Sequence, residues 1–279
     1  MCIELLLIEE NAVIKQWLQI AFQNMAPHSV LITGANRGIG LALTKEFLKN
    51  KDIGVLIAGA RDPARADELN KITDKRLKVI ELDINCDQSI DNAVRVIETI
   101  VGDNGLNCLV NNAAVSVPCE TKERTPREKI IEQFQPNVFG TLILSQALLP
   151  LLQRAASRVQ GDEFSISRAA ILNISSTGGS VTMNSAESPF GGSSKFKILG
   201  YKATKSALNQ IGRSMAIDLL ADHILVSNWC PGWVKTDMGS QAAMLEPHES
   251  AEALVNSFYK LNKSHTGNFY DRNLEVIPF

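Results

Sequence analysis

The sequence has few cysteines and no long apolar run, and each absence excludes a class of protein. The five cysteines, Cys2, Cys86, Cys108, Cys119 and Cys230, form no C-x-x-C pair in 279 residues. Few, widely spaced thiols are typical of a reduced, cytosolic protein rather than of a disulfide scaffold. No apolar run approaches the roughly 20 residues of a membrane helix, so no membrane span is expected. The N-terminus carries glutamates where a signal peptide has basic residues.

The chain also lacks an excess of charge of either sign. Lysine and arginine total 28 against 30 acidic residues, a formal charge of -2. A near-neutral chain has no overall attraction to nucleic acid, so the expected partner is a small molecule. The hydrophobic content of 45% is ordinary for a globular protein. A chain of this length buries enough surface to fold without disulfides, and no metal site is expected.

Short apolar runs alternate with helical stretches from about residue 29 onward. The runs are 30–33, 54–60, 77–82, 108–110, 169–174 and 224–229. They do not alternate with polar residues, as expected of parallel strands buried on both faces. Between them the apolar spacing is helical, for example at Ile90, Ala93 and Ile97. The pattern predicts an α/β fold over 29–279: a single-domain, doubly wound, Rossmann-like parallel sheet with helices on both faces.

Two polar segments interrupt this alternation. Residues 158–167 separate a helical stretch from a strand, and residues 180–197, rich in Ser and Gly, follow the strand at 169–174. Loops this long in a compact domain are usually functional or mobile. The second loop leaves the carboxyl end of a strand, the edge where open α/β sheets bind ligands.

A glycine cluster lies between the first strand and the first helix. Residues 33–40 read T-G-A-N-R-G-I-G, with the spacing G-x-x-x-G-x-G. Glycines let backbone N–H groups approach a pyrophosphate, and the helix N-terminus favours the anion. The expected dinucleotide ligands here are Gly34, Asn36, Arg37, Gly38, Ile39 and Gly40. A tight βα turn without a ligand is the alternative.

The end of the second strand indicates which dinucleotide would bind. An NAD site usually has an acidic residue there, whereas this strand ends in Gly59, Ala60 and Arg61. Together with Arg37, Arg61 favours a ribose 2′-phosphate, because guanidinium pairs bidentately with phosphate. We therefore predict NADP(H) over NAD(H). Each arginine alone is also consistent with a solvated surface charge. Asp62 is expected to cap a helix, and binding of the ribose is the alternative for this residue.

A Tyr-Lys pair is the candidate catalytic element. Tyr201 and Lys205 are four residues apart in a helical stretch and so share one face. A neighbouring ammonium is expected to lower the pKa of the phenol, which could then exchange a proton with a carbonyl or alcohol oxygen. Ser176 follows the strand at 169–174 and could bind the same oxygen. Strand alternation places Ser175 on the opposite face.

Five motifs occur in an order that resembles the short-chain dehydrogenase/reductase family. They are T-G-A-N-R-G-I-G at 33–40, N-N-A-A at 111–114, S-S at 175–176, Y-K-A-T-K at 201–205 and P-G-W-V-K-T at 231–236. The Asn-Arg glycine loop, the last motif and the long loop before Tyr201 are most similar to the sniffer-type carbonyl reductases. The resemblance covers roughly residues 28–279 and implies an NADPH-dependent reductase of aldehydes, ketones or quinones.

The resemblance also implies a role for each matching residue. Tyr201 would be the general acid, with Lys205 lowering its pKa and binding ribose hydroxyls. Ser176 would polarise the substrate carbonyl, and Asn137 would hold a water in a proton relay. Tyr201 would also contact the cofactor. The remaining cofactor contacts would come from Gly34, Gly38 and Gly40 at the pyrophosphate, Asp83 and Ile84 at adenine, Asn111, and Pro231, Gly232, Val234 and Thr236 at the nicotinamide.

Two other functions are compatible with these residues. One is an NADP-dependent alcohol or hydroxysteroid dehydrogenase that works mainly as an oxidase. The other is a catalytically silent NADP(H)-binding sensor, against which the complete set of four catalytic positions argues. Members of the family often form homodimers through helices that correspond to 136–155 and 201–220, although insertions before the tyrosine can block this contact.

The sequence departs from the family pattern in three places. Ala114 replaces the usual glycine, Ser176 and Tyr201 are farther apart than in many members, and residues 1–28 have no counterpart. The longer separation falls in the loop at 180–197 and is expected to reshape the substrate pocket. In the extension, Val13, Ile14, Trp17, Leu18, Ala21, Phe22 and Met25 share one helical face. This helix is expected to pack on the domain, and a partner-binding or membrane-surface helix is the alternative. Translation could also begin at Met25.

Overall fold

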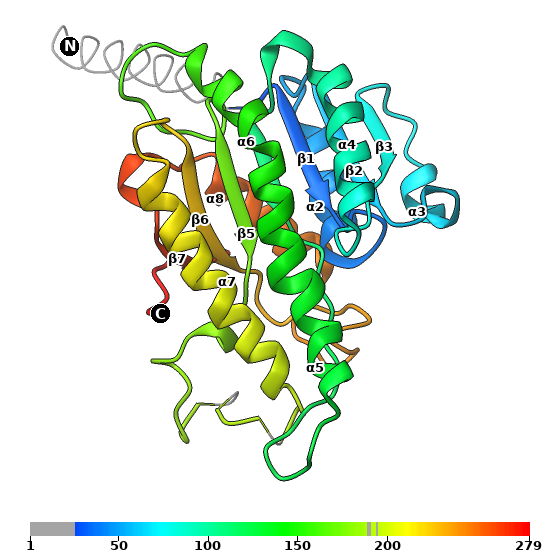
Figure 1. The fold of residues 1–279 in the computed structure, drawn as a ribbon, viewed down its shortest axis with the longest axis vertical. Coiled ribbons are helices and arrows are strands. Elements are labelled where there is room, and N and C mark those ends of the chain that lie inside the picture. Colours follow the sequence, from blue (N-terminus) through cyan, green and yellow to red (C-terminus); the bar gives the residue numbers. More distant parts are fainter. Residues whose placement is uncertain (1–25, 189–190, 194) are drawn as a thin grey trace, which may run out of the picture.

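A seven-stranded parallel sheet forms the centre of the protein (Figure 1). The computed structural model describes residues 26–188, 191–193 and 195–279. The strands are β1 (Ser29–Thr33), β2 (Val55–Ala60), β3 (Leu77–Glu81), β4 (Cys108–Asn111), β5 (Ala170–Ile174), β6 (Leu225–Cys230) and β7 (Phe269–Asp271). Their order is β3-β2-β1-β4-β5-β6-β7, and all pairs are parallel. The predicted doubly wound fold is confirmed, with its switch point between β1 and β4.

Six of the strands coincide with the predicted apolar runs, and the seventh was not predicted. β7 has three residues and adds to the outer edge of β6, where Phe269 pairs with Asn228. Three residues are too few to give a periodic signal in the sequence. The apolar face predicted for residues 13–25, and the start proposed at Met25, lie outside the described residues.

Helices cover both faces of the sheet (Figure 1). They are α2 (Gly38–Lys49), α3 (Asp67–Asn70), α4 (Asp87–Val101), α5 (Arg127–Phe134), α6 (Thr141–Ser157), α7 (Leu199–Asp218) and α8 (Pro247–Phe258). Alternate strand residues enter separate cores: Val30 and Ile32 pack with α2 and α8, whereas Leu31 packs with α4 and α6. The alternation follows from the two-residue repeat of a strand, and it explains why the strands are apolar throughout.

The helix that follows β4 begins at Arg127, before the stretch from 136 to 155 that the sequence predicts. α5, a π-helical turn at Gln135–Gly140 and α6 form one run, with Pro136 inside it rather than at its start. Within the described residues, the run Arg127–Ser157 is long and apolar enough to cross a membrane, and half of its most apolar window is buried in the protein. Leu144, Leu148 and Leu151 pack on the sheet, so its apolar composition is that of a core helix.

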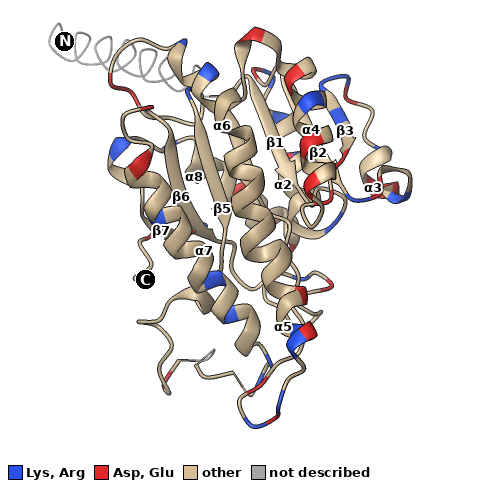
Figure 2. Ribbon diagram, in the orientation of Figure 1, with Lys and Arg blue, Asp and Glu red and all other residues tan. Residues whose placement is uncertain are grey.

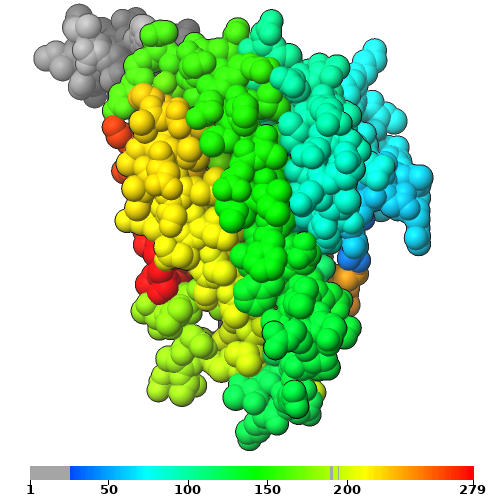
Figure 3. Space-filling view, viewed as in Figure 1, coloured from blue at the N-terminus to red at the C-terminus, as the bar shows by residue number. Residues whose placement is uncertain are grey.

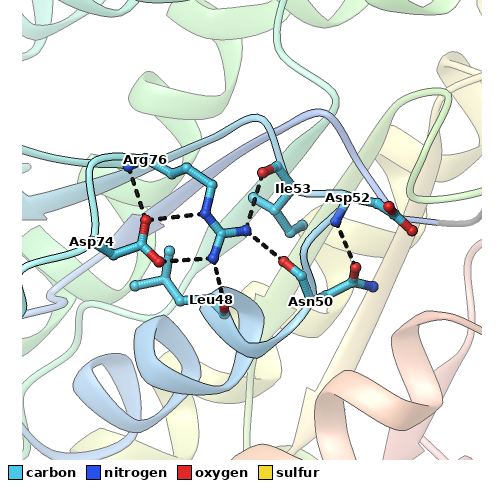
Figure 4. A network of polar contacts seen from close by, with 6 residues as sticks. All are labelled: Leu48, Asn50, Asp52, Ile53, Asp74 and Arg76. Carbon is cyan, nitrogen blue, oxygen red and sulfur yellow. Dashed lines mark hydrogen bonds and ion pairs between the residues drawn. The ribbon is translucent and has the colours of Figure 1, made fainter.

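An arginine joins the end of α2 to the loop before β3 (Figure 4). The Arg76 guanidinium donates to the carbonyl oxygens of Leu48 at 2.5 Å, Asn50 at 2.6 Å and Ile53 at 3.2 Å, and to the Asp74 carboxylate at 2.8 and 3.0 Å. The last carbonyls of a helix have no intrahelical donor, so Arg76 satisfies the C-terminus of α2. Its hydrogen bonds to Asp74 hold the pKa of that carboxyl at about 2.

This network predicts a pH-dependent loss of stability. The pKa of Asp74 is depressed in the folded state, so its contribution is complete above the unfolded pKa of about 4 and disappears as the pH falls toward about 2. We expect Asp74→Asn to lower the free energy of unfolding by about 2 kcal/mol at pH 7. Urea unfolding of both proteins at pH 7 and at acid pH measures the difference. A difference that stays constant across this range would contradict the assignment.

Candidate active site

The carboxyl ends of the central strands bring the predicted site residues to one edge of the sheet. The glycine loop follows β1, Asn111 ends β4, Ser175 and Ser176 follow β5, and the motif at 231–236 follows β6. Figure 2 shows almost no charged residues along β1, β5 and β6, whereas they are frequent in the outer helices and loops. The charges near this edge therefore come from a few individual side chains.

The glycine loop requires glycine for two separate reasons. Gly34 and Gly38 have φ of +63° and +55°, which other residues rarely adopt. A Cβ on Gly40 would lie 2.2 Å from the Gly34 carbonyl oxygen. The first turn of α2 has neither a side-chain cap nor an acidic residue, so its N–H groups can bind an anion. The loop fits the pyrophosphate of a dinucleotide.

Asn112, which the sequence motifs did not single out, connects this loop to β4. Its amide nitrogen donates to the carbonyl oxygens of Thr33 at 2.9 Å and Gly34 at 3.2 Å. The Thr33 hydroxyl in turn accepts from the backbone N–H groups of Asn112 and Ala113 at 3.0 and 2.9 Å. In the sequence, the role of Asn112 is indicated only by its place as the second Asn of N-N-A-A. The sequence alone does not show which of the two asparagines contacts the glycine loop.

Asn111 is directed into the sheet rather than toward the glycine loop. Its amide nitrogen donates to Asn173 Oδ1 at 2.9 Å and to Ser145 Oγ at 3.0 Å, and the residue is buried. Asn173 donates in turn to Asn228 on β6 at 3.1 Å. The three asparagines occupy paired positions in neighbouring strands and form a polar row across the sheet. The side chain of Asn111 therefore braces the strand ends beneath the site.

The segment after β6 lies against the glycine loop. The Thr236 methyl group would be 3.2 Å from a Cβ on Gly38, and Arg37 Nη1 lies 2.6 Å from Asp237 Oδ2. Both members of this ion pair are largely exposed, at 66% and 78%. Exposed pairs contribute about 0–1 kcal/mol, so a phosphate can compete for the guanidinium. Pro231 and Val234 are buried at the base of the same segment, and Gly232 turns with a φ of +84°.

The ends of β2 and β3 carry the residues expected at the adenine ribose. Arg61 is exposed directly after β2. Asp62 accepts a hydrogen bond from the Ala64 N–H at 3.1 Å, so its predicted capping role is confirmed. Asp83, half-buried after β3, and the buried Ile84 lie at the same edge. The preference for a 2′-phosphate at this edge stays a prediction.

Tyr201 and Lys205 lie in the first turns of α7, close to Ser176. Lys205 Nζ donates to the Ile174 carbonyl oxygen at 2.7 Å and lies 5.6 Å from the centre of the Tyr201 ring. The Tyr201 phenol interacts with the Ser176 hydroxyl. The Cys230 thiol, at the end of β6, completes this cluster and lies 3.0 Å from Thr177 Oγ1.

The pKa of the tyrosine moves in the opposite direction to the one expected from the Tyr-Lys spacing. Burial raises the pKa of Tyr201, Cys230 adds to the increase, and only the hydrogen bond with Ser176 opposes it. Burial also lowers the pKa of Lys205 to about 8. The Tyr-Lys spacing reveals only the attraction between phenolate and ammonium. In the structure the same burial penalises both charged forms, and the Ile174 carbonyl engages the ammonium.

The two serines after β5 are clearly separated. Ser175 is buried, and its hydroxyl donates to Asn209 Oδ1 at 2.6 Å. Ser176 is half-buried, and its oxygen accepts from the Gly178 N–H at 3.0 Å. Ser176 is thus the serine beside Tyr201, in agreement with the alternation argument.

Asn137 is buried in the π-helical turn between α5 and α6. Its amide pairs with the backbone of Val115, accepting from the N–H and donating to the carbonyl at 2.8 Å each. Its second amide hydrogen goes to Thr204 Oγ1 at 3.0 Å, one residue before Lys205. Both side-chain hydrogens are therefore used to join the β4–α5 connection to α7.

Comparisons with known proteins identify the family. The family model for short chain dehydrogenase matches residues 28–245, and the chain belongs to this family. Sniffer of Caenorhabditis elegans is 44% identical, with a TM-score of 0.84, over 91% of this chain and 100% of that one. The carbonyl reductase Sniffer of D. melanogaster is 31% identical, with a TM-score of 0.84, over 91% and 100%. An NADPH-bound carbonyl reductase from chicken fatty liver is 32% identical, with a TM-score of 0.85, over 91% and 95%. The protein is an oxidoreductase whose fold resembles that of the sniffer-type enzymes.

The position of Asn112 predicts a specific effect on dinucleotide affinity. Asn112→Ala removes two hydrogen bonds that hold the glycine loop to β4. We expect dinucleotide binding to weaken about tenfold, because the loop loses about 1–2 kcal/mol of pre-organisation. Titration calorimetry with NADPH and NADH measures the change. Gln210→Ala, on the exposed side of α7, is the matched control, and an Asn112→Ala affinity equal to wild type would disprove the bracing role.

Proposed function

We propose that the protein is an NADPH-dependent carbonyl reductase that transfers a hydride to the carbonyl carbon of an aldehyde, ketone or quinone. The observation that carries the proposal is the meeting of Ser176, Tyr201 and Lys205 beside a glycine loop that fits a pyrophosphate. The carbonyl reductases among its structural relatives, one of them NADPH-bound, support it. A cytosolic location is part of the same proposal.

The protein residues would supply the proton and the orientation. The bound nicotinamide supplies the hydride. Because its pKa is raised by burial, Tyr201 keeps its proton at neutral pH and can donate it to the carbonyl oxygen. The Ser176 hydroxyl donates a hydrogen bond to the same oxygen, which accumulates negative charge during reduction.

Lys205 would hold the ribose and return the proton to the tyrosine. With a pKa of about 8 the ammonium is mostly protonated at pH 7 yet can release its proton. Asn137 uses both of its amide hydrogens within the fold, so a water in the relay would bind its main-chain carbonyl. The polar contacts of Asn137 keep α7, and with it Lys205, in position.

The role of Tyr201 gives the most direct test of the proposal. Tyr201→Phe removes the proton donor and keeps the ring, so kcat for NADPH-dependent carbonyl reduction is expected to fall about 1000-fold. The dissociation constant for NADPH should change less than about threefold, because the phenol does not bind the pyrophosphate. Stopped-flow turnover and cofactor titration separate the two quantities. Near-normal turnover by Tyr201→Phe would remove this residue from the mechanism.

Cofactor preference depends on Arg37 and Arg61 in this proposal. Each guanidinium would contribute a charge-assisted hydrogen bond to the 2′-phosphate, about 1.5–3 kcal/mol. Arg37→Ala or Arg61→Ala should therefore lower kcat/KM for NADPH at least tenfold and leave the value for NADH within about twofold. Arg95→Ala on α4 is the control. A wild-type enzyme that prefers NADH would refute the 2′-phosphate assignment.

A further inference from the structure

The loop that follows Ser176 has little apolar contact to hold it in place. Residues 181–187 are all exposed, including Val181 at 73% and Met183 at 40%. Ordering each such residue costs about 1–2 kcal/mol of backbone entropy, which exposed side chains cannot offset. Its order must therefore depend on polar contacts.

One end of this loop is held by the C-terminal segment. Ser180 Oγ donates to the Pro278 carbonyl at 2.5 Å, and the Thr182 N–H donates to the Phe279 oxygen at 3.1 Å. Ser180 Oγ also accepts from the Met183 N–H at 3.0 Å. These bonds secure the start of the loop but not its return toward α7.

The return is held by Lys202, the residue after Tyr201. Lys202 Nζ donates to Asn184 Oδ1 at 2.9 Å and to the Gly192 carbonyl at 2.6 Å. Asn184 Oδ1 also accepts from the Gly192 N–H at 3.0 Å. The Asn184 amide and the Lys202 ammonium therefore join the two sides of the loop. The Lys202 stem passes over Gly178, where a Cβ would lie 3.3 Å from Lys202 Cγ, beside the turn that holds Ser176.

Lys202 is buried, so its ammonium depends on the hydrogen bonds to the loop rather than on water. Only 7% of the residue is exposed, although ammonium groups normally remain in water. Burial lowers its pKa, and the hydrogen bonds to the loop compensate for the lost solvation. Figure 3 shows that the loop forms one side of a notch below the lower end of α7, opposite the segment that precedes α5.

We propose that Lys202 is a positioning residue that fixes residues 180–188 and 191–193 as an apolar wall of the substrate pocket, so that the enzyme favours carbonyl substrates with a bulky apolar body over small aldehydes. The proposal rests on the carbonyl reductase function above. Val181 and Met183 are the exposed apolar side chains of this loop that would form the wall. Lys202 acts through the loop and does not contact the reacting atoms.

The test combines Lys202→Met, Asn184→Ala and the double variant, with Lys129→Met on exposed α5 as the control. Lys202→Met keeps the stem and removes the ammonium. Amide hydrogen exchange in residues 183–188 and 191–193 should become at least tenfold faster in Lys202→Met and in Asn184→Ala. The double variant should add little, because both changes break the same contact. Exchange elsewhere, and the NADPH dissociation constant, should stay unchanged.

Kinetics on two substrates test the pocket itself. With NADPH, KM for a bicyclic aromatic ketone should rise about fivefold to tenfold in Lys202→Met, while KM for propanal and kcat for both remain within about twofold. Lys202→Arg should restore part of the selectivity. Unchanged loop exchange would overturn the role of Lys202, and faster exchange with unchanged selectivity would overturn the role of the loop. A wild-type enzyme that reduces no carbonyl would instead refute the proposed function, and hydrogen exchange would still decide whether Lys202 holds the loop.

Discussion

The close approach of two backbone segments at the end of β1 is the constraint on which the site depends. Gly40 can lie against the Gly34 carbonyl only because it has no side chain, and this contact directs the N-terminus of α2 into the crevice. Asn112 fixes the same turn from β4, across the switch point of the sheet. The anion site, the strand order and the polar row that begins at Asn111 are therefore parts of one arrangement.

Burial determines the electrostatics of the catalytic cluster more than the attraction between its charges does. Tyr201 and Lys205 share an environment that penalises phenolate and ammonium alike, so one pKa rises while the other falls. A neutral phenol is the form needed to give a proton to a carbonyl oxygen. A lysine whose pKa lies near 8 can pass a proton on at neutral pH. In the proposed reductase, this cluster would donate a proton in the reducing direction.

The sequence predicted the fold well because each level of its pattern points to the same answer. Apolar strands, helical spacing between them and a glycine turn after the first strand all require a covered parallel sheet. β7 escaped prediction because its three residues pair only with β6 and carry no periodic signal. The π-helical turn around Asn137 was not predicted, because Pro136 is typical of the start of a helix. Only the structure shows that the helix continues through Pro136. For the candidate site, the sequence predicted which residues would lie at one sheet edge but not the contacts that they make there. The order of the motifs along the chain predicts that Ser176, Tyr201 and Lys205 lie at one sheet edge. The direction of the Tyr201 pKa shift depends on burial, which residue spacing does not show. Which of Asn111 and Asn112 contacts the glycine loop depends on the direction of each side chain.

Lys202 illustrates the same limit in the loop between β5 and α7. In the sequence it is one more charge on a helix, a residue that is usually solvated. In the structure it closes a loop whose partners, Asn184 and Gly192, are 18 and 10 positions away. A long loop beside a reacting centre gains a defined shape only if some group offsets its entropy. Because that group follows Tyr201 in the chain, the proposed pocket wall and the proposed proton donor would be held by the same helix, α7.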